Sequence, residues 1–462
     1  MLSQSDASST EAKAAYSWPA CAANWKAVAN GMPIQWTAEY PIFSDAWLTG
    51  EIKQQLGPYQ LINTASPRQK HEMHLYPAVV LRVDWHLPID ALSPNFSEPD
   101  ATSYHGGYPE DEVAALLGLC IGARMKAGGA TRHFDPEGDP RGRPSVYAHK
   151  IVQQIPLPRV KSRVLPWTDR PHYVNEADNP TFGRFHTLTY RNASAIVKAA
   201  RLHQEALWIA EGAPEMAWVL LVTAIETAAF HWRNVTMSPR DWLENRKPEL
   251  CAQFVKEKRE DLLQLVADQM QFGATAQFRG FLEEFCPSAP AERPKDRRHQ
   301  HPWEKRALKK SFCAIYSRRS NFVHSGIPFP AMMCMSPTRD DTDRARPRYS
   351  EICLGSGFAV GGGSWKWKKK DAPMQLHIFE YIVRGALLEW WKWCLPEVPY
   401  LNTATESDLQ KAPGIGKKQA ERVVAHRTTH GHYKSFDDLL LIPNIGQKAV
   451  DAIKAHTTLV KK

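Results

Sequence analysis

An arginine and a histidine stand five residues apart in the string Arg319-Ser320-Asn321-Phe322-Val323-His324. Histidine titrates near neutral pH and can move a proton. A guanidinium group can stabilise the charge that builds on phosphoryl oxygens. These two roles would support RNA cleavage by the ribose 2′-OH without a metal ion. Since a chain of this length contains on the order of one such pair by chance, the elements that carry the pair have to be considered.

The string ends a predicted amphipathic helix. One stripe of this helix recurs at spacings of four and three, as a helical face requires; it consists of Leu308, Phe312, Ile315, Arg319 and Phe322. Ser325-Gly326 is a stop signal after His324. By the same periodicity another face carries four polar residues, namely Ser317, Ser320, Asn321 and His324.

A second helix, expected from Glu215 to about Arg233, is apolar nearly all round and therefore belongs in the middle of a bundle. Glu226 lies inside it, and a buried carboxylate requires a partner or a site. Two hypotheses remain open for Arg319: a catalytic role, or an ion pair with Glu226 that leaves His324 at a helix C-terminus. Arg318 is an alternative to Arg319 as the arginine of the pair.

Arg319 and His324 are separated by about 140° around an ideal helix, so a second subunit would most simply complete the site. The segment from Tyr316 to Gly326 resembles the signature of HEPN domains, especially the Apea-like branch of bacterial defence proteins, over residues 192–396. The resemblance implies a helical bundle and a metal-independent, dimeric ribonuclease. It points to Arg319 and His324 as catalytic residues, to which we add Glu226 and Asn321 as candidates.

The end of the chain contains one short unit twice, thirty positions apart: Pro413-Gly414-Ile415-Gly416 recurs as Pro443-Asn444-Ile445-Gly446. Such repetition indicates a supersecondary unit that is used twice. Each copy reads as helix, tight hairpin and helix, with a capping signal before it in Thr405 to Asp408 and in Ser435 to Asp438. Gly414, Ile415, Gly416, Asn444, Ile445 and Gly446 form the bends, and Lys417, Lys418 and Lys448 follow them at helix starts, where N–H groups attract anions.

This repeat is very similar to the tandem helix-hairpin-helix of bacterial competence DNA receptors, from Leu401 onward. The resemblance implies binding to the DNA backbone with little sequence preference. Asn444 stands where a glycine is usual, and asparagine tolerates the left-handed region. The second hairpin could therefore be weaker or mainly structural. The alternative for the whole tail is a helical pair that docks onto a protein.

Composition and charge set outer limits on the function. The formal net charge of +9 is compatible with a polyanion partner, although solubility explains it equally well. There is no apolar run long enough for a membrane span, and the start lacks the pattern of a secretory signal. Eight cysteines without a CxxC pair indicate reduced thiols in a cytoplasm and argue against a zinc ribbon.

Residues 1–175 are expected to form an α+β domain of unknown role. Alternation from Val79 to His86 predicts a strand, Pro109 to about Lys126 predicts a helix closed by Gly128-Gly129, and Lys150 to Ile155 suggests another strand. His71-Glu72-Met73-His74 does not have the HExxH spacing of a zinc site. We therefore expect no metal and no cofactor.

The remaining parts of the sequence are predicted to be helical or irregular. Helices are expected at 194–212 with Ser194 as the cap, at 239–272, 274–285 and 375–395. The glycine-rich stretch from Leu354 to Gly363 lacks the spacing of a nucleotide-binding loop and indicates a hairpin or loop. Trp365 to Lys370 alternates aromatic and basic residues, which suits either a basic edge strand or stacking on single-stranded bases.

The sequence thus predicts a mainly α protein: an N-terminal α+β domain at 1–175, a HEPN-like helical domain at 192–396, and a tandem helix-hairpin-helix DNA-binding domain at 400–462. The leading hypothesis is a cytoplasmic bacterial nuclease that cleaves RNA, forms a homodimer, is localised to DNA by its tail and acts in phage defence. The alternative is a non-catalytic DNA-binding scaffold, or an accessory protein of DNA repair or uptake.

Overall fold

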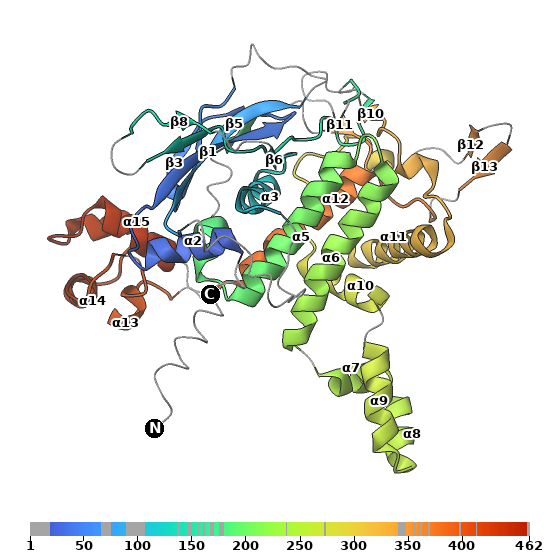
Figure 1. Cartoon of the computed structure of the whole chain (residues 1–462). Helices are drawn as coiled ribbons and strands as arrows, with labels where there is room; N and C mark the ends of the chain where they lie inside the picture. The colour runs from blue at the N-terminus through green and yellow to red at the C-terminus, as the bar shows by residue number, and fades with distance from the viewer. Residues whose placement is uncertain are drawn as a thin grey trace.

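The computed structural model forms a body of sheet and helices, with the tail beside it and a helical arm projecting from it (Figure 1). It describes residues 19–459 except 66–74, 89–106, 136–138, 146–149, 156, 160–161, 167–170, 175–179, 237, 272–273, 341–347, 354–356, 361–362, 368–369, 397–398 and 413. The His71 to His74 motif lies outside the described residues. Among the described helices, none combines the length and the hydropathy that a bilayer-crossing segment requires.

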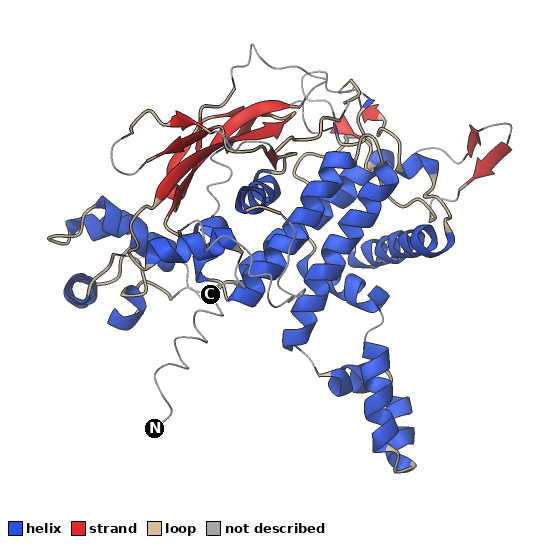
Figure 2. Cartoon of the chain, viewed as in Figure 1, coloured by secondary structure: helices blue, strands red, loops and turns tan. Residues whose placement is uncertain are grey.

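The N-terminal part contains an antiparallel sheet of order β3-β4-β5-β1-β7-β8, with β6 also paired to β1 (Figure 2). Its strands are β1 (Trp36–Ser44), β3 (Ile52–Leu56), β4 (Tyr59–Ile62), β5 (Tyr76–Trp85), β6 (Lys126–Ala127), β7 (Arg132–Phe134) and β8 (Arg143–Pro144). A separate parallel pair joins β2 (Trp47–Thr49) to β9 (Pro171–Tyr173). The predicted strand is confirmed as β5, because the alternating residues Val79, Leu81, Val83 and Trp85 are all buried.

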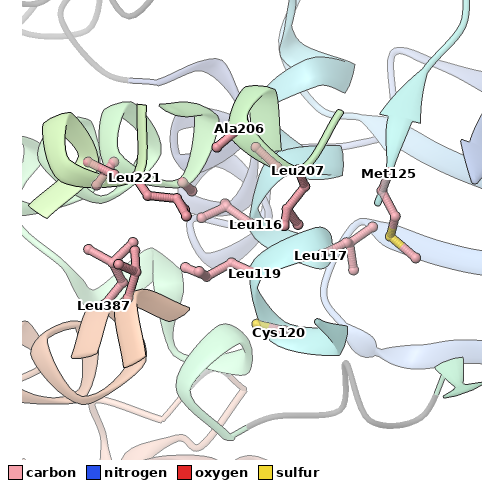
Figure 3. Close-up of a cluster of buried hydrophobic side chains, with 14 of the residues drawn as sticks. Leu116, Leu117, Leu119, Cys120, Met125, Ala206, Leu207, Leu221 and Leu387 are labelled. Atoms are coloured by element: carbon pink, nitrogen blue, oxygen red, sulfur yellow. The ribbon is translucent and has the colours of Figure 1, made fainter. Parts of the chain in front are cut away.

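Helix α3 (Pro109–Ile121) lies between the sheet and the helical bundle, next to α2 (Ala20–Ala29) (Figure 1). Its buried leucines lie in the same core as Leu207, Leu221 and Leu387, which come from three different helices of the bundle (Figure 3). The helix ends at Gly122, which is left-handed with φ +76°. The prediction that it runs to Lys126 was therefore wrong, because an earlier glycine provides the left-handed stop and Lys126 enters β6.

Residues 150–155 are irregular, so the strand predicted there is absent from this described segment. The backbone lies along a bundle helix instead of at a sheet edge. Trp208 donates its indole N–H to the Gln153 carbonyl at 3.3 Å. Val152 and Ile155 pack against the same tryptophan. Val152 and Ile155 are thus partly covered by the helix, whereas Ile151 is 92% exposed.

The bundle is built around α6 (Pro214–Thr236), which packs against the other four helices, as its all-round apolar sequence predicts. These are α5 (Tyr190–Ile209), α10 (Ala274–Phe285), α11 (Lys305–Ser325) and α12 (Leu376–Cys394). The cap of α5 is Thr189, whose hydroxyl accepts from the Asn192 N–H at 3.3 Å. Ser194 is not the cap, because the helix begins one turn earlier than the apolar pattern indicates. Before it lie the short α4 (Pro180–Gly183) and the 3-10 helix η6 (Phe185–Thr187).

A three-helix arm leaves the bundle after α6 and projects from the body (Figure 1). It comprises α7 (Pro239–Arg246), α8 (Pro248–Lys256) and α9 (Glu260–Gln271), within the range expected to be helical. The arm has a small core of its own, made of Leu243, Cys251, Leu263 and Ala267. This core is separate from the core that the sheet and the bundle share.

Sheet and bundle share one continuous hydrophobic core, which a buried ionic network crosses. Asp45, beside β1, accepts from the guanidinium groups of Arg124 at 2.5 Å and Arg163 at 2.8 Å. Arg124 also contacts Glu211, at the end of α5, at 3.0 Å. All four side chains are at most 1% exposed. The network therefore joins the N-terminal part to the bundle.

A short 3-10 helix, η7 (Arg297–His299), precedes α11. Between α11 and α12 the described residues form short elements: η8 (Ala331–Met333), β10 (Arg339–Asp340), β11 (Arg348–Tyr349), β12 (Gly357–Val360) and β13 (Gly363–Lys366). β12 and β13 pair as an antiparallel hairpin, which confirms the hairpin interpretation of the glycine-rich stretch. Trp365 and Lys366 lie in its second strand.

The tail folds around a second, separate core. Its elements are α13 (Glu406–Leu409), α14 (Lys417–His430), the 3-10 helix η9 (Phe436–Leu441) and α15 (Gln447–His456). Its two ends are joined by a bridge, in which Leu401 N–H donates to Thr458 O at 2.8 Å and Thr458 N–H to Pro399 O at 3.1 Å. The repeat therefore forms a closed unit after α12.

Candidate nucleic-acid interface

The two bends of the tail have matching backbones. We name them the first hairpin (Gly414–Gly416) and the second hairpin (Asn444–Gly446). Gly414 has φ +78° and Asn444 has φ +64°, so asparagine adopts the left-handed conformation that glycine adopts in the first copy. In each bend the isoleucine N–H donates back to a carbonyl three residues earlier at 3.1 Å. The substitution at Asn444 thus preserves the bend.

Ile415 and Ile445 are each 5% exposed and pack in the tail core, which confirms that they anchor the bends. Repeat-related pairs fill this core: Leu409 with Leu439, Ala412 with Ile442, Ala420 with Val450, and Val423 with Ile453. In each bend the isoleucine side chain is buried, and the glycines next to it, Gly414, Gly416 and Gly446, are exposed to solvent. The bends are therefore not packed inside the protein.

Gly416 and Gly446 are the N-caps of α14 and α15. The first turn of a helix leaves N–H groups without intrahelical partners, and these attract anions. Lys417, Lys418 and Lys448 are exposed beside them. Each hairpin thus combines backbone donors, the positive end of a helix dipole and ammonium groups, which suits a phosphate.

The two helix starts differ in one contact. Gly416 N–H donates to the side-chain oxygen of Gln419 at 3.3 Å. The repeat-related residue of Gln419 is Ala449, which has no side-chain acceptor to offer Gly446. The second hairpin therefore leaves its cap amide more accessible, which argues against the expectation that the second copy is the weaker one.

Capping boxes hold the segments before the bends. Asp408 N–H donates to the Thr405 hydroxyl at 3.1 Å, and Thr405 N–H donates to the Asp408 carboxylate at 3.1 Å. Lys411 and Thr405 lower the pKa of Asp408 to about 2. In the second copy Ser435 N–H donates to the Asp438 carboxylate at 2.9 Å. The helix-opening signals in the sequence are thus confirmed as caps.

Residues 400–458 match the family model of the helix-hairpin-helix motif. No curated protein and no solved structure matches the chain. The match covers the closed unit described above and both hairpins. It supports nucleic-acid binding by this helix-hairpin-helix tail.

A cleft of about 1000 Å³ separates the first hairpin from the body. The first hairpin and Lys411 line one side, and Asn30, Arg184 and His186 line the other. The second hairpin does not line it. The Arg184 guanidinium donates to the Pro396 carbonyl at 2.6 Å. Its Nε is buried, and within the described residues it has no hydrogen-bond partner.

His186 packs at the body side of this cleft, stacked on Trp25 at 5.5 Å between ring centroids and near His456 at 5.5 Å. Burial, and then the positive neighbours His456, Lys26 and Arg184, lower the pKa of His186 to about 4. The imidazole is thus neutral near neutral pH. The residues that line the body side of the cleft come from the N-terminal half of the chain, and no spacing in the sequence signals their approach to the tail.

Acid is expected to destabilise the protein through His186. The folded-state pKa is about 4 against an ordinary 6.5, so between these values the unfolded chain binds more protons. The free energy of unfolding therefore falls as the pH drops from about 6.5 toward 4, by about 1–2 kcal/mol after allowance for partial exposure. Urea unfolding of wild type and His186→Gln at pH 7 and pH 4.5 measures this loss. A variant that loses as much stability as the wild type contradicts the assignment.

Arg319 does not stand free at the bundle surface. Its Nη2 donates to Glu226 Oε2 at 2.8 Å, and the Tyr316 hydroxyl donates to Glu226 Oε1 at 2.8 Å. The Arg319 and Glu226 side chains are 19% and 20% exposed. Glu226 contributes to raising the pKa of Tyr316, after burial. Glu226 therefore holds both groups of α11 against α6.

His324 lies exposed in the last turn of α11, which ends at Gly326 with φ +64° as predicted. Asn321 is half-buried one turn earlier. The alternative arginine, Arg318, forms an ion pair with Asp371 at 3.1 Å. Arg319 thus faces α6, whereas His324 faces solvent, so one chain does not bring these two candidate residues into a single pocket.

Proposed function

We propose that this protein binds DNA through its helix-hairpin-helix tail, without sequence preference. The residues that hold the backbone are Gly414, Ile415, Gly416, Lys417, Lys418, Asn444, Ile445, Gly446 and Lys448. The observation that carries the proposal is the equivalence of the two bends: each has one left-handed residue, one buried isoleucine, and a solvent-facing helix start with at least one lysine.

Phosphate recognition follows from this arrangement. The main-chain donors are fixed by the bend and require no side-chain ordering, and the lysines add charge that releases counterions from DNA. Because these groups meet phosphates and not base edges, they carry no sequence information. A glycine at the helix start leaves room for a phosphate oxygen to approach the backbone.

The experiment that tests the proposal is fluorescence anisotropy on closed duplexes of two unrelated sequences over a range of salt concentrations. We expect the two dissociation constants to agree within about threefold, and log K to fall linearly with log salt. Absence of binding at low salt would leave the alternative, a helical pair that docks onto a protein.

A second candidate function belongs to the bundle: a metal-independent endoribonuclease in which Arg319, His324, Glu226 and Asn321 act. His324 would take the proton of a ribose 2′-OH, and a guanidinium would stabilise the phosphoryl oxygens. The exposure of His324 and the partial exposure of the Arg319–Glu226 pair support it. Since the two residues face differently on one helix, the proposal requires a homodimer that pairs Arg319 of one subunit with His324 of the other. Phage defence in a bacterial cytoplasm is the setting that the HEPN resemblance implies.

RNA cleavage in EDTA distinguishes this enzyme from a non-catalytic DNA-binding scaffold or an accessory of DNA repair or uptake. We expect His324→Ala to lower the rate by about 100-fold or more, since it removes the proton carrier. Arg319→Ala should lower the rate and also the free energy of unfolding by about 1–3 kcal/mol, because Glu226 loses its cationic partner and keeps only the Tyr316 hydroxyl. Lys309→Ala, on the same helix, is the matched control. Cleavage at the wild-type rate by both site variants eliminates the ribonuclease.

A further inference from the structure

The cleft beside the first hairpin divides the tail into two unlike binding surfaces. The first hairpin faces the body across the cleft, whereas the second hairpin lies outside it. In Figure 1 the tail lies next to α2, and Asn30, at the end of α2, is part of the cleft wall. A duplex laid across the first hairpin would meet this wall.

The volume of the cleft indicates which form of DNA it can bind. A volume of about 1000 Å³ is at the upper end of the range of about 300–1000 Å³ that encloses small molecules. A few nucleotides of one strand fit such a space, whereas the exposed second hairpin lies outside it and is open to a duplex. We propose that the cleft binds an unpaired DNA strand, so that the tail recognises a junction of duplex and single strand, with the duplex on the second hairpin. This rests on the proposed DNA binding.

The charges that face the cleft suit a phosphodiester backbone. The Arg184 side chain lines the cleft, and its Nη2 donates one N–H to the Pro396 carbonyl at 2.6 Å. The exposed backbone of Gly414 and Gly416 lines the cleft from the other side. The carboxylate in the lining, that of Asp408, is bound by Lys411 Nζ at 2.9 Å and by the Thr405 hydroxyl. The negative group is thus compensated within the tail itself.

Rings in the same lining provide faces for bases. Tyr400, His186 and His456 all line the cleft, and the Tyr400 ring is held by a hydrogen bond from the Asn402 side chain to its hydroxyl at 3.2 Å. Bases of any identity stack on aromatic side chains, because each has a π-face. A strand whose phosphate sits on the first hairpin therefore has aromatic rings beside it in the same cleft.

The test compares three DNA probes of equal duplex length: a closed circle, a blunt linear duplex, and the linear duplex with an overhang of about ten nucleotides. We expect wild type to bind the overhang probe about tenfold more tightly than the blunt one, which corresponds to about 1.4 kcal/mol. Arg184→Gln and Lys411→Gln should each reduce this ratio toward one and leave closed-circle affinity within about twofold. Because Lys411 is exposed, its variant tests the cleft even where Arg184→Gln does not fold.

Arg191→Gln is the matched control, because Arg191 is exposed at the start of α5 and does not line the cleft; its overhang ratio should equal that of the wild type. Equal wild-type affinity for the blunt and overhang probes overturns the junction proposal while DNA binding stands. Failure to bind the closed circle overturns the proposed function itself. If both Arg184→Gln and Lys411→Gln lose affinity for the closed circle while the ratio of overhang to blunt affinity is unchanged, the assignment of the cleft to an unpaired strand is also contradicted.

Discussion

Affinity for the duplex with a single-stranded overhang is expected to fall about 100-fold when valine replaces both Gly416 and Gly446. A hydrogen bond to a charged group contributes about 1.5–3 kcal/mol, and each tenfold change in affinity corresponds to about 1.4 kcal/mol. Losing one phosphate contact at each hairpin lowers the affinity about tenfold twice, which gives the roughly 100-fold change. The single variants should each lose about tenfold, with Gly446→Val at least as severe because its amide is the more accessible.

The fold should survive these substitutions. Gly416 has φ −81° and Gly446 has φ −96°, values that valine adopts readily. A Cβ at either position meets nothing within 4 Å, so the added methyl groups occupy the space that a phosphate needs. Valine at Gly414 would instead be strained, because that residue has φ +78°.

Anisotropy titration against the overhang duplex measures the loss. Gly280→Val, in α10, is the matched control, because a Cβ there also meets nothing within 4 Å and the residue lies far from the tail in the chain. Its affinity should equal that of the wild type. Undiminished binding by the double valine variant, with the tail folded by circular dichroism, contradicts the assignment of the hairpins.

The second large effect concerns stability. Asp45→Asn should lower the free energy of unfolding by about 3–5 kcal/mol, since it removes the charge that two buried guanidiniums share. Arg124 and Arg163 are at most 1% exposed, so water cannot replace the lost carboxylate. Because the network joins sheet and bundle, both should unfold together at lower urea.

Urea unfolding followed by tryptophan fluorescence measures this loss. The matched control is Asp139→Asn, whose partner Arg143 is 83% exposed at 3.3 Å; exposed pairs contribute about 0–1 kcal/mol. A loss for Asp45→Asn no greater than that of the control refutes the structural role of the network. Since the tail has its own core, the hairpin variants should not share this destabilisation.

Local signals predicted the tail well because each depends on residues close in sequence. The capping boxes at Thr405 and Ser435, the buried isoleucines and the left-handed Asn444 all follow from turn and cap chemistry. The same holds for the stop of α11 at Gly326. Where two local signals competed, the sequence misled: Gly122 ends α3 before Gly128, and Thr189 caps α5 before Ser194.

Long-range relations could not be derived in this way. Asp45, Arg124, Arg163 and Glu211 are far apart in the chain, and their ionic network exists only once the sheet meets the bundle. The cleft likewise pairs Arg184 with a hairpin more than 200 positions later. For Arg319, periodicity identified both the helix face and Glu226 as a possible partner, yet only packing brings the two side chains to 2.8 Å.

The bridge between Leu401 and Thr458 has a consequence for modular exchange. A unit whose entry and exit points lie side by side can be inserted into a host loop without stretching either. The helix-hairpin-helix tail therefore meets the geometric condition for transplantation as a cassette, and grafting residues 399–459 into a surface loop of an unrelated carrier would require only a short spacer on each side.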